Sequence, residues 1–210
     1  MRLQTAGRTR RDEQVSGRTP RRSELVSAAA ELFSQRGYHG ASMKHLADAL
    51  GLQKGSLYAH IGSKEDLLFD VVDDGAERFI ERARQALQAG GTATERLTLF
   101  LIGHVETAIE HIDAATVFLN EWRYLSDPQR SIIRDKRNRY EGMVRDLIAE
   151  GVASGEFKHD VDVRFAAILV LSAGNWVYAW YRPEGDLTPT DIGRRFAELI
   201  AGGLLEEGRT

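Results

Sequence analysis

The sequence predicts an all-α protein, and three observations predict that class. Apolar residues recur at helical spacing along most of the chain, no segment alternates as a β-strand does, and Gly or Pro separates the helical runs. A chain of 210 residues, 42% of them hydrophobic, can hold a small module and a larger domain, or one extended domain. We expect an N-terminal three-helix unit joined by a long helix to a helical body.

The first expected helix follows Thr19-Pro20, where threonine caps and proline takes the first helical position. It runs to about Arg36, and Gly37 supplies its stop. Its apolar stripe consists of Leu25, Val26, Ala29, Leu32 and Phe33. This helix is expected to cover the segment that follows it.

Residues 42–67 predict a helix-turn-helix. Leu46, Ala47 and Leu50 lie on one face of a short helix, Gly51 ends it, and a second apolar set begins at Leu57. Two short helices that meet near a right angle cannot bury their own cores, so they lean on neighbouring helices. The second short helix is then free to enter a DNA major groove.

This stretch closely resembles the DNA-binding signature of the tetracycline-repressor (TetR) family, over roughly residues 19–70. The matching positions are Ser42, Leu46, Ala47, Ala49, Gly51, Leu52, Gly55, Ser56, Leu57, Tyr58, His60, Ser63, Lys64, Glu65, Asp66 and Leu67. The resemblance implies a dimeric repressor that binds a palindromic double-stranded DNA operator. Ile61 stands where the family usually has Phe, so we expect slightly altered packing without loss of DNA binding.

Each candidate DNA-binding residue has a task that its side chain permits. Gln53, Lys54 and Ser56, together with Gly55, start the second short helix, the end that points at base edges. Gln can address adenine and Lys can address guanine.

Four further side chains are candidates for contacts with the DNA backbone. Ser42 caps the first short helix and can offer a hydroxyl to phosphate, and Tyr58, His60 and Lys64 are expected to clamp phosphates. For Tyr58 the alternative is a core ring with only its hydroxyl exposed.

Residues 1–18 are polar, Arg-rich and without periodicity, and predict a disordered basic arm. The arginines nearest the folded unit, Arg18, Arg21 and Arg22, either belong to a solvated tail or reach phosphate or a minor groove. We place the DNA-binding domain, the head, at 19–66, and the body, for ligand binding and dimerisation, at 67–210.

The charge is divided unevenly between these parts. Residues 1–64 carry 11 Lys/Arg against 5 Asp/Glu, whereas residues 65–210 carry 17 against 26. A basic head on an acidic body indicates that only the head meets a polyanion. No run reaches the roughly 20 apolar residues of a membrane span, so no membrane partner is expected. The absence of cysteine fits a cytoplasmic protein.

The body is expected to be helical throughout. Ser63 and Asp66 form a capping-box-like start for a helix to about Ala89 that joins head and body. Further helices are expected over residues 94–112, 114–125, 127–155, 161–181 and 189–204. Asp160 is the expected cap of the fourth of these, and Thr188 with Asp191 forms a capping box for the last.

The helix over residues 161–181 is apolar nearly all round, so it must be buried on more than one side. The last helix carries the small residues Gly202 and Gly203. Together they predict pairing with the same two helices of a second chain, because a palindrome requires two copies. The alternative is that both helices are only the core of one chain.

Polar and aromatic residues in the body predict a ligand pocket. The candidates are Asn120, Trp122, Arg123 and Tyr124 in one segment and Asn175, Trp176 and Tyr178 in another. A buried, unpaired Asn175 would cost a few kcal/mol. Its partner is therefore either another protein group or the ligand.

Arg130, Arg134 and Arg137 fall at i, i+4 and i+7 and form a positive stripe. Some of their charges belong to ordinary helix-surface pairs, yet the stripe suits an anionic ligand, with Arg134 and Arg137 as candidate contacts. The segments FLNEWRYLSDPQR and GNWVYAWYRPEGDLTP are similar to TetR-like regulators that respond to acyl-CoA thioesters. That resemblance implies an apolar tunnel for the acyl group, arginine contacts for the coenzyme phosphates, and release of DNA on binding.

The rival effector is a hydrophobic or cationic drug-like molecule, which would be recognised by Glu106, Glu110 or Glu121. An enzyme is a further alternative. A di-metal site needs two Glu-x-x-His pairs on facing helices, and Glu156–His159 is the single instance. His104 and His111 are expected to be solvated or helix-capping. No catalytic residues, no metal site and no cofactor are therefore predicted.

Overall fold

The computed structural model describes residues 21–205, and the regular elements in that range are helices without β-strands. An isolated antiparallel bridge joins Phe157 to Leu205. The all-α class is therefore confirmed. The helices are α1 (Arg22–Gly40), α2 (Met43–Leu50), α3 (Lys54–Tyr58), α4 (Lys64–Gln88), α5 (Ala93–Glu110), α6 (Ile112–Asn120), the 3-10 helix η1 (Trp122–Tyr124), α7 (Asp127–Ala153), α8 (Val163–Asn175), α9 (Val177–Trp180) and α10 (Pro189–Leu204).

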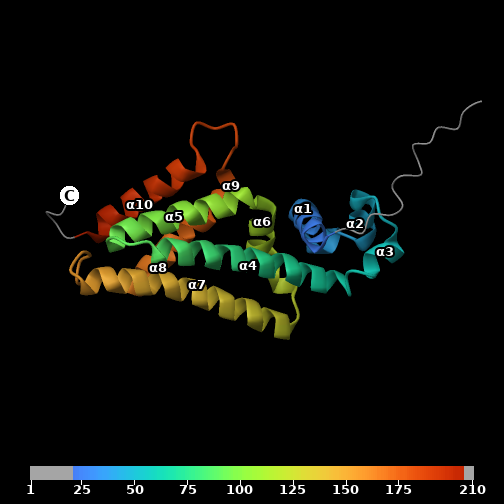
Figure 1. Cartoon of the computed structure of the whole chain (residues 1–210), viewed down its shortest axis with the longest axis horizontal. Helices are drawn as coiled ribbons and strands as arrows, with labels where there is room; N and C mark the ends of the chain where they lie inside the picture. Colours follow the sequence, from blue (N-terminus) through green and yellow to red (C-terminus); the bar gives the residue numbers. More distant parts are fainter. Residues whose placement is uncertain (1–20, 206–210) are drawn as a thin grey trace, which may run out of the picture.

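The molecule is elongated, with α1, α2 and α3 at one end and the body at the other (Figure 1). The helix α4 is continuous from residue 64 to residue 88, so the expected boundary at residue 66 falls inside a helix. The arm over residues 1–18 and the Thr19-Pro20 cap lie outside the described residues.

Local signals position the three helices of the head. Ser42 caps α2 and accepts a hydrogen bond from the His45 N–H at 3.2 Å. Gly51 ends α2 in the left-handed conformation, with φ of +66°, which costs glycine little. The small core beneath them includes Phe33, Leu46 and Leu57, all nearly inaccessible to solvent.

The head core is continuous with the body. Ile61 is buried in it, and Val117, Leu125 and Ile133 join the same cluster from beyond α4. The helix α1 packs against α4 and α6 as well as against α2. A shift of α4 or α6 therefore changes the support of the head directly.

Close approach of α5 and α10 organises the far end of the body. A Cβ on Gly193 of α10 would lie 2.5 Å from the Ile102 Cα and 2.9 Å from the Leu101 carbonyl oxygen. Only glycine fits there without displacing backbone. The helices α7 and α8 complete a second core, which is separate from the head core.

Two of the expected helices differ from expectation in their ends. The helix α1 continues to Gly40 across a break at Gly37, where φ is +68°, and it begins at Arg22. Asp162, not Asp160, caps α8 by accepting from the Phe165 N–H at 2.9 Å. The expected helix over 161–181 is two helices, because the chain turns at Trp176 between α8 and α9.

Residues 114–125 also form two elements, α6 and η1, since the α-helix ends at Asn120. The remaining helices match their expected positions closely. Thr188 and Asp191 form the predicted capping box of α10, and proline follows at the first position.

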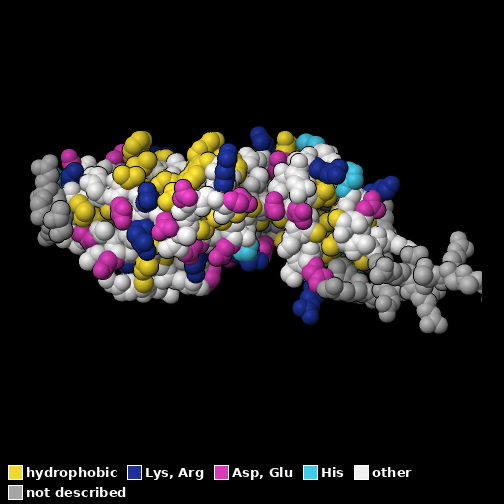
Figure 2. All heavy atoms as spheres, turned by 90° about the horizontal axis from the view of Figure 1, so that it is seen from above, with side chains coloured by type: hydrophobic (Ala, Val, Ile, Leu, Met, Phe, Trp, Pro, Cys, Tyr) yellow, Lys and Arg dark blue, Asp and Glu magenta, His cyan; other side chains and the backbone are white. Residues whose placement is uncertain are grey.

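The apolar helix α8 is exposed along one side within a single chain. Phe165, Ile168, Leu169 and Trp176 share that side, and Phe165 is 66% exposed. The alternative, that this helix is only the core of one chain, therefore does not fit the exposure of these residues. Figure 2, which looks onto the α10 side of the body, shows hydrophobic side chains gathered between charged ones.

One segment passes the length and composition test for a membrane span. The window Val163–Trp180 has a mean hydropathy of 1.2, and 28% of it is buried inside the chain. The expectation that no run is apolar enough was therefore too strong. The turn at Trp176 interrupts this segment, and its exposed apolar residues are confined to one face.

Candidate functional site

The start of α3 presents the candidate base-reading residues to solvent. Gln53 precedes the helix, and Gln53, Gly55 and Ser56 are exposed while Leu57 is fully buried beneath them. Of Lys54 only the backbone is described, as the first residue of α3. His60 is exposed, and Tyr58 is 45% exposed, so the alternative of a core tyrosine ring is not what the structure shows.

Lys64 is engaged within the protein. Its ammonium group donates a hydrogen bond to the Tyr38 carbonyl oxygen and lies 4.3 Å from the centre of the Tyr38 ring. Burial lowers the pKa of Lys64. Lys64 therefore also joins the start of α4 to the end of α1.

The arginines before α1 also have described positions, apart from Arg18, which lies outside the described residues. The Arg22 guanidinium forms an ion pair with Asp70 of α4 at 2.5 Å, although its side chain is 79% exposed. The Arg21 N–H donates to the Glu24 carboxylate at 3.4 Å. Arg22 thus pairs with α4 at the surface of the protein.

A cavity of about 100 Å³, partly open to solvent, lies in the body between α4, α5, α6, α7, α8 and α9. It is lined by Ala76, Phe79, Ile80, His104, Ala108, Ala115, Phe118, Leu119, Lys136, Arg137, Tyr140, Glu141, Leu171, Asn175 and Tyr178. Its volume is below that of most ligand sites, which span about 300–1,000 Å³. A long ligand would therefore have to extend beyond this cavity or displace its lining.

Uncharged polar groups form one part of the cavity wall. His104 is only 3% exposed, and its Nδ1 lies 2.7 Å from the Tyr140 hydroxyl oxygen. Burial lowers the pKa of His104 to about 4 and raises the pKa of Tyr140, so both side chains are neutral at pH 7. His104 was expected to be solvated or helix-capping, and that expectation was wrong.

Arg137 is the unpaired charge of the cavity. Its guanidinium lies 4.9 Å from the Trp122 ring centre and 5.2 Å from that of Phe118. Its Nη1 is buried without a hydrogen-bond partner, and its burial lowers the pKa. No carboxylate among residues 21–205 forms an ion pair with it.

The neighbouring cations differ from Arg137. Lys136 also lines the cavity, but its ammonium group bonds to Asp73 at 2.5 Å and Glu77 at 2.6 Å. Burial alone would lower the pKa of Lys136, yet those hydrogen bonds raise it. Arg134 is exposed and does not line the cavity, and Arg130 pairs with Asp127. Of the three arginines in the predicted stripe, Arg137 alone therefore lines the cavity.

The other predicted ligand residues are divided between the cavity and its surroundings. Asn175 and Tyr178 line it, and Asn120 lies just behind Tyr178, with its amide 3.5 Å from that hydroxyl. Trp122 does not line the cavity, but it contacts Arg137, which does. Trp176 points away and is 63% exposed.

Arg123 and Tyr124 belong to a junction between body and head. The Tyr124 ring stacks on the Tyr38 ring with centres 5.6 Å apart, and the Arg123 guanidinium lies 5.5 Å from the Tyr124 ring centre. Glu121 accepts a hydrogen bond from the Tyr38 N–H at 3.0 Å. Tyr38, just after the Gly37 break, is therefore held from the body by both its backbone and its ring.

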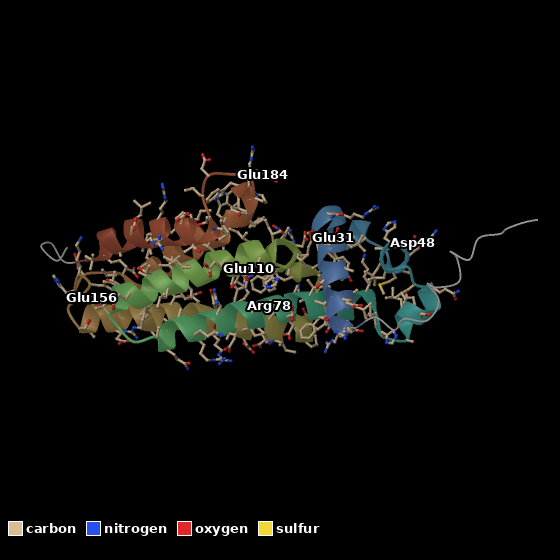
Figure 3. All side chains as sticks on the ribbon, turned by 45° about the horizontal axis from the view of Figure 1, so that its top comes forward. Glu31, Asp48, Arg78, Glu110, Glu156 and Glu184 are labelled. Carbon is tan, nitrogen blue, oxygen red and sulfur yellow. The ribbon has the colours of Figure 1, made fainter. Side chains whose placement is uncertain are left out.

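The carboxylates proposed for a cationic ligand lie elsewhere. Glu106 pairs with Arg82 and accepts from the Thr190 hydroxyl, and Glu121 is used at the junction. Glu110, labelled in Figure 3, is exposed at the end of α5. None of the three lines the cavity.

The Glu156–His159 pair has a structural use. The Glu156 carboxylate accepts hydrogen bonds from the Ala93 N–H at 2.7 Å and the Thr94 N–H at 2.8 Å, which closes the start of α5. Within residues 21–205 no group of three acidic or histidine side chains is arranged to hold a metal ion.

Sequence reasoning missed several residues of the cavity. Phe79, His104, Phe118 and Lys136 were not assigned to it, because each fits an ordinary helix equally well. The one available signal was His104 itself, a polar residue within the apolar face of α5.

Comparisons with known proteins agree with the fold and the head. The family described as "Bacterial regulatory proteins, tetR family" matches residues 25–71, and "Tetracyclin repressor-like, C-terminal domain" matches residues 90–204. The chain belongs to the TetR family and is a transcriptional regulator. This membership places it among DNA-binding regulators rather than enzymes.

Individual relatives cover nearly the whole chain. The transcriptional repressor KstR2 of Mycobacterium tuberculosis H37Rv is 31% identical over 200 residues, which are 93% of this chain and 99% of that protein. The regulator PfmR of Thermus thermophilus is 32% identical with a TM-score of 0.80, covering 87% of this chain and 99% of PfmR. AibR, solved with isovaleryl coenzyme A and operator DNA, is 27% identical with a TM-score of 0.77, covering 89% of this chain and 98% of AibR.

Proposed function

We propose that this chain is a cytoplasmic transcriptional repressor that binds a palindromic operator as a homodimer and is released by an acyl-CoA effector. The exposed start of α3 supports the DNA-binding part. Gln53, Lys54 and Ser56 are the proposed base-reading residues, and Ser42, Tyr58 and His60 are the proposed phosphate contacts. Figure 2 shows Lys, Arg and His side chains grouped at the head end of the molecule.

The homodimer is supported by the exposed apolar face of α8 and α10. The helices α8 and α10 contact each other; Phe165, Ile168 and Leu169 are exposed on α8, and Leu199 of α10 is 77% exposed. Gly203 is one turn beyond Leu199, and a Cβ added there would meet nothing within 4 Å. A face of this composition fits a second copy of the same two helices, since homodimer interfaces are rich in apolar area.

The observation that carries the effector proposal is Arg137. The Arg137 guanidinium is half-buried against Trp122 and Phe118, its Nη1 is enclosed without a hydrogen-bond partner, and none of residues 21–205 supplies it with an anion, which is costly. An anionic ligand would compensate that charge, and arginine suits phosphate because its planar donors bind two oxygens together. The apolar walls beside it suit an acyl group. AibR, a structural neighbour, was solved with an acyl-CoA.

The rival, a cationic drug-like effector, is less compatible with this cavity. The lining contains one carboxylate, Glu141, beside two cations. Glu141 already faces Arg145 at 3.6 Å. A cation would therefore enter next to Arg137 without a free counter-charge.

The route from cavity to head runs through η1. Trp122 of η1 contacts Arg137, and its neighbours Glu121 and Tyr124 hold Tyr38. A ligand that draws the Arg137 guanidinium away from Trp122, and separates α4 from α7, loosens the support of α1. The spacing of two recognition helices in the dimer then no longer matches one DNA turn.

Calorimetry with a panel of acyl-CoAs tests the effector. Arg137→Leu should weaken the affinity for the best acyl-CoA about 10–100-fold, the equivalent of one lost charge-assisted hydrogen bond. The matched control is Arg134→Leu, on the same helix but exposed, which should change that affinity less than about threefold. Equal losses in both variants, or binding of lipophilic cations and of no acyl-CoA, would overturn the proposal.

A further inference from the structure

The most enclosed part of the cavity lining is made of very small side chains. Ala76 of α4, Ala108 of α5 and Ala115 of α6 line the cavity, and each is at most 4% exposed. These three residues form the alanine wall. Ile80, one turn after Ala76 on α4, is a larger apolar residue beside it and is equally inaccessible to solvent. Three helices therefore leave space in the cavity because each presents only a methyl group to it.

The lining residues of the other three helices are less enclosed. Arg137 and Glu141 of α7 are half-buried, and so are Leu171 of α8 and Tyr178 of α9. Because the cavity is partly open to solvent, we place its opening on the side of these half-buried residues and its closed end at the alanine wall. The charged lining residues also belong to α7. A ligand with one polar and one apolar end therefore enters with its apolar end first.

The volume of the cavity limits the apolar group that can fill it. A cavity of about 150 Å³ holds one benzene ring, so each carbon atom requires roughly 25 Å³. At that volume per carbon, the cavity of about 100 Å³ holds roughly four carbon atoms. Each methylene group buried there should raise the affinity about fourfold. Further carbon atoms would have to displace closely packed lining residues, which opposes binding.

We propose that the effector carries a short acyl group of about four carbons, and that Ala76, Ala108 and Ala115 set this length. This inference rests on the proposed acyl-CoA function and specifies the acyl group that the cavity accepts. The coenzyme end stays on the side of Arg137, and the end of the acyl chain contacts the alanine wall. Since Ala76 belongs to α4, which packs against α1 of the head, an acyl group that fills the cavity touches the helix that joins body and head.

The test measures affinity along a series of straight-chain acyl-CoAs. Calorimetry with the wild-type protein should show an affinity that rises about 15-fold from acetyl-CoA to butanoyl-CoA, because two more methylene groups are buried. From butanoyl-CoA to octanoyl-CoA the affinity should fall about tenfold, because the added carbons force the lining apart. The tightest binding is therefore expected near butanoyl-CoA.

A substitution in the alanine wall should shift this optimum to a shorter chain. Ala115→Val adds two carbon atoms to the wall, so it should weaken the binding of butanoyl-CoA about tenfold and that of acetyl-CoA less than about threefold. The matched control is Ala114→Val, the same change on the same helix at a residue that packs against the head core and does not line the cavity. This control should keep the wild-type series.

The possible results separate this inference from the proposed function. If the affinity of the wild-type protein continues to rise from butanoyl-CoA to octanoyl-CoA, then the cavity does not set the length and the inference is wrong, while the acyl-CoA function stands. If no acyl-CoA binds, then both are wrong. Equal series in Ala115→Val and Ala114→Val would overturn the role of the alanine wall. The wild-type series decides the chain length whether or not Ala115→Val folds well.

Discussion

The recognition surface of the head is already exposed, whereas the cavity of the body is small and contains an unpaired charge. At the head, Ser56 and His60 are already exposed over a buried Leu57, and Ser42 and Gly51 fix the helix ends. In the body, the cavity is about 100 Å³ and its arginine is unpaired. The recognition residues of the head are therefore already accessible, whereas a ligand longer than the cavity would have to displace its lining. Binding energy spent on that change is what can alter the head.

The largest predicted effect concerns the buried histidine of the cavity. The pKa of His104 is lowered by burial from 6.5 to about 4. In the unfolded chain His104 therefore binds a proton below pH 6.5, whereas in the folded chain it binds one only below about pH 4. The free energy of unfolding should fall by up to about 1.4 kcal/mol per pH unit in that window, and His104 should contribute no pH dependence above it.

Denaturant unfolding at several pH values checks this prediction. His104→Gln should remove that pH-dependent part, and His60→Gln, at an exposed histidine of the head, should retain it. The other charged groups of the cavity, Lys136, Arg137 and Glu141, are present in both variants and cancel in the comparison. Equal pH profiles in wild type and His104→Gln would mean that the ring is not held neutral.

The next prediction tests whether the exposed face of the body is a surface for a second copy. Gly203→Trp should weaken the dimer by about 1–3 kcal/mol, because bulk at a close helix contact forces the helices apart. Gly90→Trp is the control, since Gly90 also has open space around it but lies at the end of α4. Sedimentation of both variants at low micromolar concentration measures the fraction of dimer in each. A Gly203→Trp protein that remains fully dimeric would count against this interface.

The smallest predicted effect concerns Lys64, where head and body meet. Lys64→Ala removes a charge-assisted hydrogen bond to the Tyr38 carbonyl, so the free energy of unfolding should fall by about 1 kcal/mol. DNA affinity should weaken through the position of α1, with little change in its salt dependence. A salt slope lowered by about one phosphate contact would instead support the expected role of Lys64 as a phosphate clamp.

The head was predictable because its information is local. Ser42, Gly51 and Leu57 act through neighbours a few residues away, so spacing alone indicates a helix-turn-helix. The all-α class and most helix ends followed for the same reason. The turn at Trp176 could not be predicted in this way, because the apolar run continues through it. The start of α1 at Arg22 was not predicted either.

The cavity was only partly predictable because its residues come from six helices. The stripe of arginines indicated a positive face, but spacing could not tell which member points inward. Arg137 does, and Arg134 does not. His104 was assigned to solvent because a lone histidine on a helix carries no information about the helices that will cover it. Glu121 was considered as a ligand contact, and its bond to the Tyr38 N–H arises from residues 83 positions apart.

The central claim is that an acyl-CoA in the Arg137 cavity releases the operator. The most direct measurement is the fluorescence anisotropy of a labelled operator, selected by the protein from random DNA, during titration with butanoyl-CoA and longer acyl-CoAs. The account predicts that wild type loses DNA as the effector is added, and that Arg137→Leu needs about 10–100-fold more effector while binding DNA normally without it. Operator that stays bound while calorimetry shows the cavity filled would contradict the account.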